Sequence, residues 1–438
     1  MKKKRVLYVL HNHPTLRPGG AEAYALELYR TMREQPDIEP VLVARSGRGG
    51  DIDPTVHPGA PFSVVGSDPN EYFLYTDTDG VDFFYETYRD KSLYTVYIAD
   101  FLRTFKPDVV HFQHTHFIGY DMLTLTRRLL PDVPIVYTLH EYLPICHRDG
   151  QLVRTTTEEP CLESSPRRCH ECFPEWPQAY FFLRERLIKS HLEHVDQFLC
   201  PSNFLLERYV DWGIPREKLR FEDYGRIPQE PLPDPNPNRP RTRLGFFGQI
   251  SPYKGVDVLL EAMRVLGQKA PDVHLDLHGA NIDVLPPAYK EHIETRLAAA
   301  GPNVSFVGPY TPGDVPRLMA NIDWVVVPSR WWENSPLVIQ EAFMHKRPVV
   351  CSRIGGMAEK VTDGVDGIHF TKSNAGELAD KVRIATSTPG EWERLRDGIG
   401  SVYSMDEHVA SLRAIYEGLD RGSAAGSKAA PLLAEAPG

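Results

Sequence analysis

The stretch that decides the fold runs from residue 324 to residue 341 and reads WVVVPSRWWENSPLVIQE. It opens with four apolar residues, 324–327, without polar alternation, which predicts a strand covered on both faces. A polar loop follows, and a helix is expected to begin near Pro336. A strand, a loop and a helix in this order make up the repeating unit of a parallel α/β sheet.

The same unit recurs along the whole chain. Short apolar runs, each followed by a turn and a helical pattern, lie at 6–10, 40–44, 109–112, 135–139, 198–201, 244–247, 275–277, 304–307, 324–327 and 348–351. Strands that alternate with helices predict parallel sheets, and the chain is long enough for two domains. We therefore expect an α/β fold with two doubly wound, Rossmann-like domains that face each other across a cleft.

A proline-rich segment divides the chain. Residues 228–241 can neither pack a core nor continue a helix, so they predict a linker between an N-terminal domain, 1–227, and a C-terminal domain, 242–402. We expect a C-terminal helix at 403–420 that packs back on the first domain, and a disordered tail at 421–438.

Two segments of the first domain depart from the strand and helix pattern. The stretch from about Asp68 to Asp100 carries many aromatic and acidic residues without a clear strand signal, and we interpret it as a helical insertion. A loop-rich insertion with several cysteines spans about 141–180.

Composition narrows the classes of function. A formal net charge of −10 disfavours a general nucleic-acid binder, whose surface should be basic. Residues 1–5 are basic, but the apolar run 6–10 behind them is too short for a secretory signal. No window reaches the roughly 20 apolar residues of a membrane-spanning helix. We expect a cytoplasmic protein, with peripheral contact at a membrane left open.

Two glutamates flank the start of the helix in the opening stretch. Glu333 lies in the loop and Glu341 lies in the helix, while Asn334 or Ser335 is expected to cap the first turn. The unpaired N–H groups of this turn form an anion site between two carboxylates. A sugar linked to a diphosphate needs this combination of amides and hydrogen-bond acceptors. The alternative is that the two glutamates have no role in binding and only interact favourably with the helix dipole.

Three further loops follow predicted strands and therefore lie at the same edge of their sheets. Gly19 and Gly20 precede a helix and allow a ligand to approach the backbone closely, although two glycines also make an ordinary turn. Lys254 can place its ammonium on a diphosphate, although an exposed turn lysine is usually only solvated. Tyr310 can stack on a base or simply pack in its turn.

These motifs, taken in order, resemble a known family, the retaining nucleotide-sugar-dependent glycosyltransferases of family 4, which have the two-domain GT-B architecture. The matching motifs are PGGAE at 18–22, TLHE at 138–141, PSNF at 201–204, FGQ at 247–249 with KG at 254–255, PS at 328–329 with the two glutamates, and GG at 355–356.

The resemblance implies transfer of a sugar from a nucleoside diphosphate sugar to an acceptor hydroxyl of a glycan, a lipid-linked compound or a small molecule, with retention of anomeric configuration. It implies no metal or cofactor for catalysis. The catalytic residues that it implies are Glu333, His140 and Lys254. The expected donor-binding residues are Gly19, Gly20, Gln249, Lys254, Tyr310, Asn334, Ser335, Leu337, Val338 and Glu341.

One position departs from the family pattern. Many relatives have an arginine where this chain has Gln249, which can donate a hydrogen bond to a phosphate but brings no charge. Stabilisation of the leaving group then rests on Lys254 alone or on a nearby cation such as Arg243 or Arg330. The assignment stays open.

Four cysteines fall within the loop-rich insertion: Cys146, Cys161, Cys169 and Cys172. Four thiolates around zinc would close a loop with little apolar content, so we predict a structural zinc site. An iron–sulfur cluster and a set of unrelated thiols are the alternatives, and disulfides are disfavoured in a cytoplasmic enzyme. Cys200 and Cys351 are expected to be packed free thiols.

The histidines at 111, 114 and 116 are interpreted as polar residues that line the cleft, with a metal site as the alternative. Two other functions stay open. One is sugar-nucleotide epimerisation or phosphorolysis on the same fold, and the other is a binding scaffold without catalysis.

Overall fold

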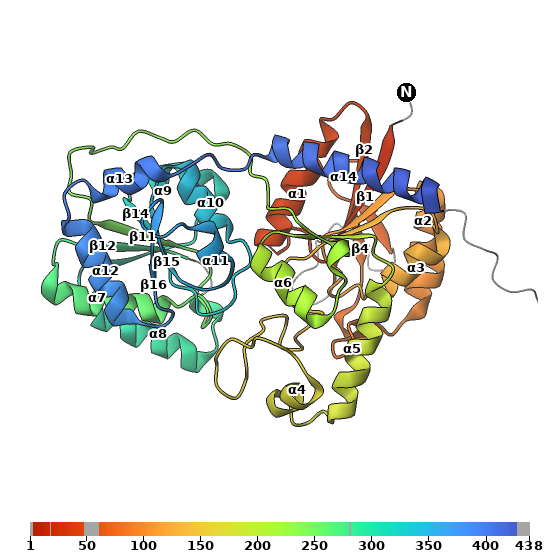
Figure 1. Ribbon diagram of the computed structural model, residues 1–438, viewed down its shortest axis with the longest axis horizontal. Coiled ribbons are helices and arrows are strands. Elements are labelled where there is room, and N and C mark those ends of the chain that lie inside the picture. Colours follow the sequence, from red (N-terminus) through yellow and green to blue (C-terminus); the bar gives the residue numbers. More distant parts are fainter. Residues whose placement is uncertain (1–2, 18, 48–60, 280–281, 427–438) are drawn as a thin grey trace, which may run out of the picture.

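The computed structural model describes residues 3–17, 19–47, 61–279 and 282–426 (Figure 1). Two α/β domains, each built around its own sheet, confirm the predicted fold class. Pro18 of the PGGAE motif and residues 427–438 of the predicted tail lie outside the described residues.

The first domain contains an eight-stranded sheet that is parallel except for β3, which runs antiparallel to β4. Its strands, in their order across the sheet, are β10 (Leu219–Phe221), β9 (Gln197–Cys200), β8 (Ile135–Thr138), β7 (Val109–Phe112), β1 (Lys4–Leu10), β2 (Ile38–Ser46), β4 (Glu71–Tyr75) and β3 (Phe62–Val64). Its helices are α1 (Gly20–Arg33), α2 (Ala99–Phe105), α3 (Asp121–Leu129), α4 (Pro166–Cys172), α5 (Gln178–Leu192) and α6 (Asn203–Trp212).

The second domain contains a six-stranded sheet that is parallel throughout. Its strands, in order, are β13 (Val304–Gly308), β12 (His274–His278), β11 (Arg243–Phe247), β14 (Trp324–Val327), β15 (Val349–Ser352) and β16 (Gly367–Phe370). Its helices are α7 (Val256–Lys269), α8 (Pro287–Ala299), α9 (Val315–Ala320), α10 (Leu337–Met344), α11 (Gly355–Lys360), α12 (Ala375–Ser387) and α13 (Glu391–Gly398).

The apolar runs form strands because each is buried on both faces. Along β1, Leu7 and Val9 belong to one core cluster, while Val6, Tyr8 and Leu10 belong to another. Side chains alternate across a strand, so the two clusters lie on opposite faces of the sheet. Parallel sheets need helices on both faces, which explains why these runs are continuously apolar.

The prediction of a helical insertion from Asp68 to Asp100 is wrong for most of that stretch. Strand β4 joins the sheet beside β2, and Phe73 and Leu74 on it are fully buried. A short 3-10 helix, η1 (Thr78–Gly80), and a two-stranded hairpin, β5 (Val81–Asp82) and β6 (Thr87–Tyr88), follow. Longer helical structure begins only at residue 91 and includes a π-helical segment, η2 (Leu93–Ile98). This segment forms a strand because Phe73 and Leu74 are buried in the sheet, although acidic residues and tyrosines flank them.

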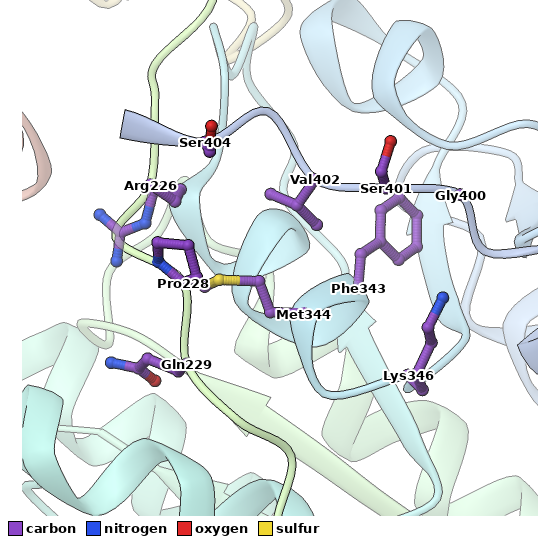
Figure 2. A pocket seen from close by; sticks show the side chains of 10 residues that line it. All are labelled: Arg226, Pro228, Gln229, Phe343, Met344, Lys346, Gly400, Ser401, Val402 and Ser404. Carbon is purple, nitrogen blue, oxygen red and sulfur yellow. The ribbon is translucent and has the colours of Figure 1, made fainter. Parts of the chain in front are cut away.

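The chain crosses between the domains twice. The first crossing contains the proline-rich segment, and the second returns to the first domain just before α14 (Met405–Gly426). The two crossings pair at Arg226 and Ser404. A cavity of about 200 Å³ lies between them and the end of α10 (Figure 2), and none of the predicted site residues lines it.

Helix α14 lies along the first domain beside α1 (Figure 1). Tyr416 on α14 is fully buried and shares hydrogen bonds with His111 and Tyr8. The helix continues through residues 421–426, beyond the expected end at 420. Within the described ranges, no helix is both long and apolar enough to cross a membrane.

Candidate active site

Glu333 and Lys254 are brought together at the carboxyl edge of the second sheet. The Lys254 Nζ atom donates to Glu333 Oε1 over 2.7 Å, and the Ser329 hydroxyl donates to the same oxygen, also over 2.7 Å. Burial raises the pKa of the Glu333 carboxyl, but the Lys254 ammonium and these hydrogen bonds outweigh it, so the pKa lies below its ordinary value. The carboxylate is therefore ionised at neutral pH.

Glycines hold the two loops of this pair against their neighbours. A Cβ atom on Gly255, whose φ is +68°, would collide with the backbone carbonyl of Pro328. A Cβ atom on Gly356 would collide with the carbonyl of Asn334, while the Gly356 N–H donates to the Glu333 carbonyl over 2.8 Å. The two glycines thus fix the position of the loop that carries Glu333.

The start of α10 differs from the predicted cap. Pro336 occupies the N-cap position, and no side chain in the described part of the chain caps the helix. The expected caps face the first domain instead: the Ser335 hydroxyl donates to Asp223 over 2.8 Å, and Asn334 Oδ1 accepts from Ser202 over 2.7 Å. Without a side-chain cap, the first-turn amides at Leu337 and Val338 are available to an anion.

Glu341 lies inside α10, as predicted, and contacts a residue that the motifs did not single out. Its Oε1 atom accepts from Arg226 Nη2 over 3.0 Å, and Arg226 also pairs with Glu27 on α1 over 3.2 Å. Burial raises the pKa of Glu341 against the opposing charge of Arg226. Tyr310 lies close enough that the charge of Glu341 helps to raise the pKa of its phenol, after burial.

His140 contacts the donor-side loop through its backbone. The Asn334 side-chain amide donates to the His140 carbonyl over 3.4 Å, so Glu333 and His140 lie on facing segments. The imidazole makes hydrogen bonds with the Tyr224 hydroxyl, over 2.6 Å, and with Gln113 Oε1, over 3.1 Å. Burial, and secondarily the neighbouring histidines, hold its pKa well below the ordinary value, so the ring is neutral.

The remaining donor-side residues are placed at the same edge. Gly20 begins α1 so near to α10 that a Cβ atom on it would lie 3.7 Å from the Leu337 side chain. Gln249 is exposed just after β11. The two candidate cations are paired elsewhere, Arg243 with Asp276 over 2.8 Å and Arg330 with Asp257 over 2.6 Å.

The motifs missed two residues of the contact between the domains. Arg226 holds Glu341, and Asp223 accepts hydrogen bonds from Ser335 and from Lys360, the latter over 2.6 Å. Both lie where the chain leaves the first domain, and no local spacing marks them. The one sequence signal for these two residues was that both are charged and stand just before a proline-rich linker.

The cysteine cluster gives no support to the zinc prediction. All four thiols are free, and burial raises the pKa of Cys146 to about 12 and that of Cys169 to about 11. Among the residues that the structure describes, no three or more His, Cys, Asp or Glu side chains are arranged to hold a metal ion. Structural zinc stays a prediction. Cys200 and Cys351 are buried free thiols, as expected.

One of the three grouped histidines is not where the sequence placed it. His111 is fully buried, and its two ring nitrogens make hydrogen bonds with Thr138 and Tyr416, each over 2.7 Å. It points to the face of the sheet that α14 covers, because residue 111 lies inside β7 rather than beyond its end. The cleft-lining interpretation is therefore wrong for His111.

Comparisons with known proteins cover both domains. Residues 18–221 match the family model described as Glycosyltransferase Family 4, and residues 241–387 match the one described as Glycosyl transferases group 1. Spore coat protein SA of Bacillus subtilis is 28% identical over 39% of this chain and 48% of its own length. Lipopolysaccharide 1,2-N-acetylglucosaminetransferase of Salmonella typhimurium is 25% identical over 66% of this chain and 76% of its own length. The chain spans about half the length of the first two relatives it matches.

Solved structures share the whole fold at low sequence identity. HepE of Anabaena, solved in complex with UDP, is 17% identical with a TM-score of 0.66 and covers 95% of this chain and 100% of its own. Sucrose-phosphate synthase of Thermosynechococcus elongatus is 16% identical with a TM-score of 0.70 and covers 96% of this chain and 100% of its own.

Proposed function

Because the chain is a glycosyltransferase of the family 4 type with the GT-B fold, we propose that it moves a sugar from a nucleoside diphosphate sugar to an acceptor hydroxyl with retention of configuration. HepE has been solved with UDP, with UDP and glucose, and with UDP-glucose, so a UDP-linked hexose is the first donor to consider.

The observation that carries the proposal is the pair of Lys254 and Glu333 at the open start of α10. The pair supplies an ammonium for the diphosphate and an ionised carboxylate for the hydroxyls of the sugar, 2.7 Å apart. The first-turn amides of α10 and the helix dipole add positive potential for the phosphates. Glu341, one helical turn further on, supplies an acceptor for the ribose hydroxyls.

In the proposed reaction the bond between the anomeric carbon and the diphosphate breaks first, and Lys254 stabilises the charge that develops on the leaving phosphate. The acceptor hydroxyl attacks from the same face, and its proton passes to the departing phosphate. The neutral imidazole ring of His140 is held by two hydrogen bonds. The backbone of His140 faces the side on which the sugar would bind. Positioning and charge stabilisation then supply most of the rate.

The test is turnover of UDP-glucose and related donors, measured as released nucleoside diphosphate. We expect Glu333→Gln to lower turnover by at least about 100-fold, because a preorganised charged group at the reacting sugar is lost. Glu261→Gln on α7, a matched change on the surface, should keep the wild-type rate. Near wild-type turnover in Glu333→Gln would show that the site is misassigned.

A further inference from the structure

The first domain carries a group of histidines that the proposed reaction does not use. Three of them lie just beyond the ends of β1 and β7, and each is paired with a carboxylate. His11 Nε2 lies 3.0 Å from Glu22, His114 Nε2 lies 3.3 Å from Glu141, and His116 Nδ1 lies 3.0 Å from Glu86. Such pairing fixes the orientation of each imidazole.

The paired histidines lie against one another and next to the donor side. The rings of His11 and His114 are 4.1 Å apart between centroids. Glu22 packs against Gly19, in the loop that meets α10, and Glu141 directly follows His140. The second ring nitrogen of His11, Nδ1, is buried and has no hydrogen-bond partner among the residues that the structure describes. A buried polar atom without a partner is costly unless a ligand completes it.

An exposed aromatic ring borders the same group. Phe83 is 43% exposed, and its ring centroid lies 5.9 Å from that of His116. The next residue, Phe84, is buried and stacks on Trp176 at 4.3 Å, which anchors the hairpin loop and leaves Phe83 outside. Glu86 of the same loop has a φ of +52°, an unfavourable backbone conformation for glutamate, and its carboxylate pairs with His116.

We propose that these residues form the acceptor subsite and that the acceptor is a neutral sugar ring. This inference rests on the proposed function and names the acceptor class for it. Oriented imidazoles and carboxylates exchange hydrogen bonds with several hydroxyls, while Phe83 covers the apolar face of a pyranose. An apolar alcohol would leave the buried Nδ1 atom of His11 unpaired. An anionic acceptor would meet three carboxylates.

Transfer kinetics test the acceptor class. With a working donor, methyl glycosides of glucose, galactose, mannose and N-acetylglucosamine are compared with phenol, octanol and glycerol phosphate as acceptors, and products are identified by mass. We expect at least one methyl glycoside to be glycosylated. Phe83→Ala should raise the KM for that acceptor at least 10-fold with a smaller change in kcat. The same change at Phe182, a similarly exposed phenylalanine on α5, should not. Transfer only to phenol, octanol or glycerol phosphate, or an unchanged KM in Phe83→Ala, would overturn the proposal.

A second measurement separates this inference from the donor chemistry. Saturation-transfer NMR on the full chain, without nucleotide, should detect binding of at least one of the methyl glycosides, and Phe83→Ala should abolish the signal. Absence of signal from all four overturns the acceptor proposal even if nucleotide binding is intact. A signal that survives in Phe83→Ala shows that the sugar binds elsewhere and also overturns it.

Discussion

Lys254 and Glu333 neutralise each other in this structure, and that balance has a consequence for substrate binding. The pKa of the buried Glu333 carboxylate is held low chiefly by the Lys254 ammonium, so the carboxylate loses most of its stabilisation if that ammonium moves away. A diphosphate must therefore share Lys254 with Glu333 rather than remove it. Because Gln249 brings no charge and both candidate arginines are paired elsewhere, Lys254 is the cation that we propose for the leaving group.

His11 predicts a fall in stability with acid. Burial lowers its pKa to about 4, whereas in the unfolded chain the ring takes up a proton near the ordinary value of about 6.5. The contribution to stability is therefore complete above about pH 6.5 and is lost as the pH falls towards 4, by about 3 kcal/mol. Urea unfolding between pH 7 and pH 4 measures it.

His11→Asn, which takes up no proton, should show a shallower loss of unfolding free energy over this range. His292→Asn on the surface of α8 serves as the matched control and should follow the wild type. Superimposable pH profiles for His11→Asn and the wild type would contradict the assignment of this loss to His11.

At the residue scale, the sequence predicts those site residues that follow a strand. Glu333 and Lys254 were singled out because each lies in a loop that follows an apolar run, and parallel strands end at one edge. His140 was assigned from the family resemblance. Arg226 and Asp223 were not found, because their partners Glu341 and Ser335 are 115 and 112 positions away. The predicted helix cap at Asn334 was wrong for the same reason, because the side chain of Asn334 makes its hydrogen bonds with the first domain instead.

At the scale of elements, the cysteine-rich insertion reaches the donor side. Arg148 lies over the ring of Tyr253, 5.7 Å from its centroid, and Tyr253 precedes Lys254. Glu159 of the insertion pairs with Lys372 of the second domain. Any interaction that stabilises the insertion therefore also stabilises the loop that carries Lys254.

The zinc prediction can be tested on this element. If the four cysteines bind zinc, replacement of Cys169 and Cys172 by serine should remove the metal and lower Tm by at least about 5 °C, because binding energy becomes folding energy. Elemental analysis of the purified full chain and thermal unfolding give the two readouts, with Cys200→Ala as the control that keeps the metal. No bound zinc in the wild type, together with an unchanged Tm, would end the prediction.

Some helices and strands were predicted from the sequence and others were not. The apolar runs predicted the inner strands to within a few residues, because burial on both faces leaves a continuous signal. Strand β4 was not predicted, because Glu71 and three aromatic residues surround Leu74 and this pattern is also compatible with a helix. The π-helical segment η2 has no local signature in composition.

At the scale of the whole molecule, the two domains are joined by contacts that involve residues of the proposed donor site. Arg226 bonds Glu341 on α10 and Glu27 on α1, so one guanidinium links the predicted ribose acceptor to the first domain. Helix α14 ties the end of the chain to the same domain through Tyr416. The sequence predicted the two domains and the linker. It could not predict these ties, which join segments far apart in the chain.

Calorimetric titration of the full chain with UDP, GDP, ADP, dTDP and CDP and their common sugar conjugates measures binding at the proposed donor site. We expect one base to bind, and Glu341→Gln to weaken that binding at least 10-fold because the carboxyl group proposed to accept from the ribose hydroxyls is lost, while Glu261→Gln binds as the wild type does. Binding of none of these nucleotides, or equal affinity in Glu341→Gln, would contradict the proposed donor site.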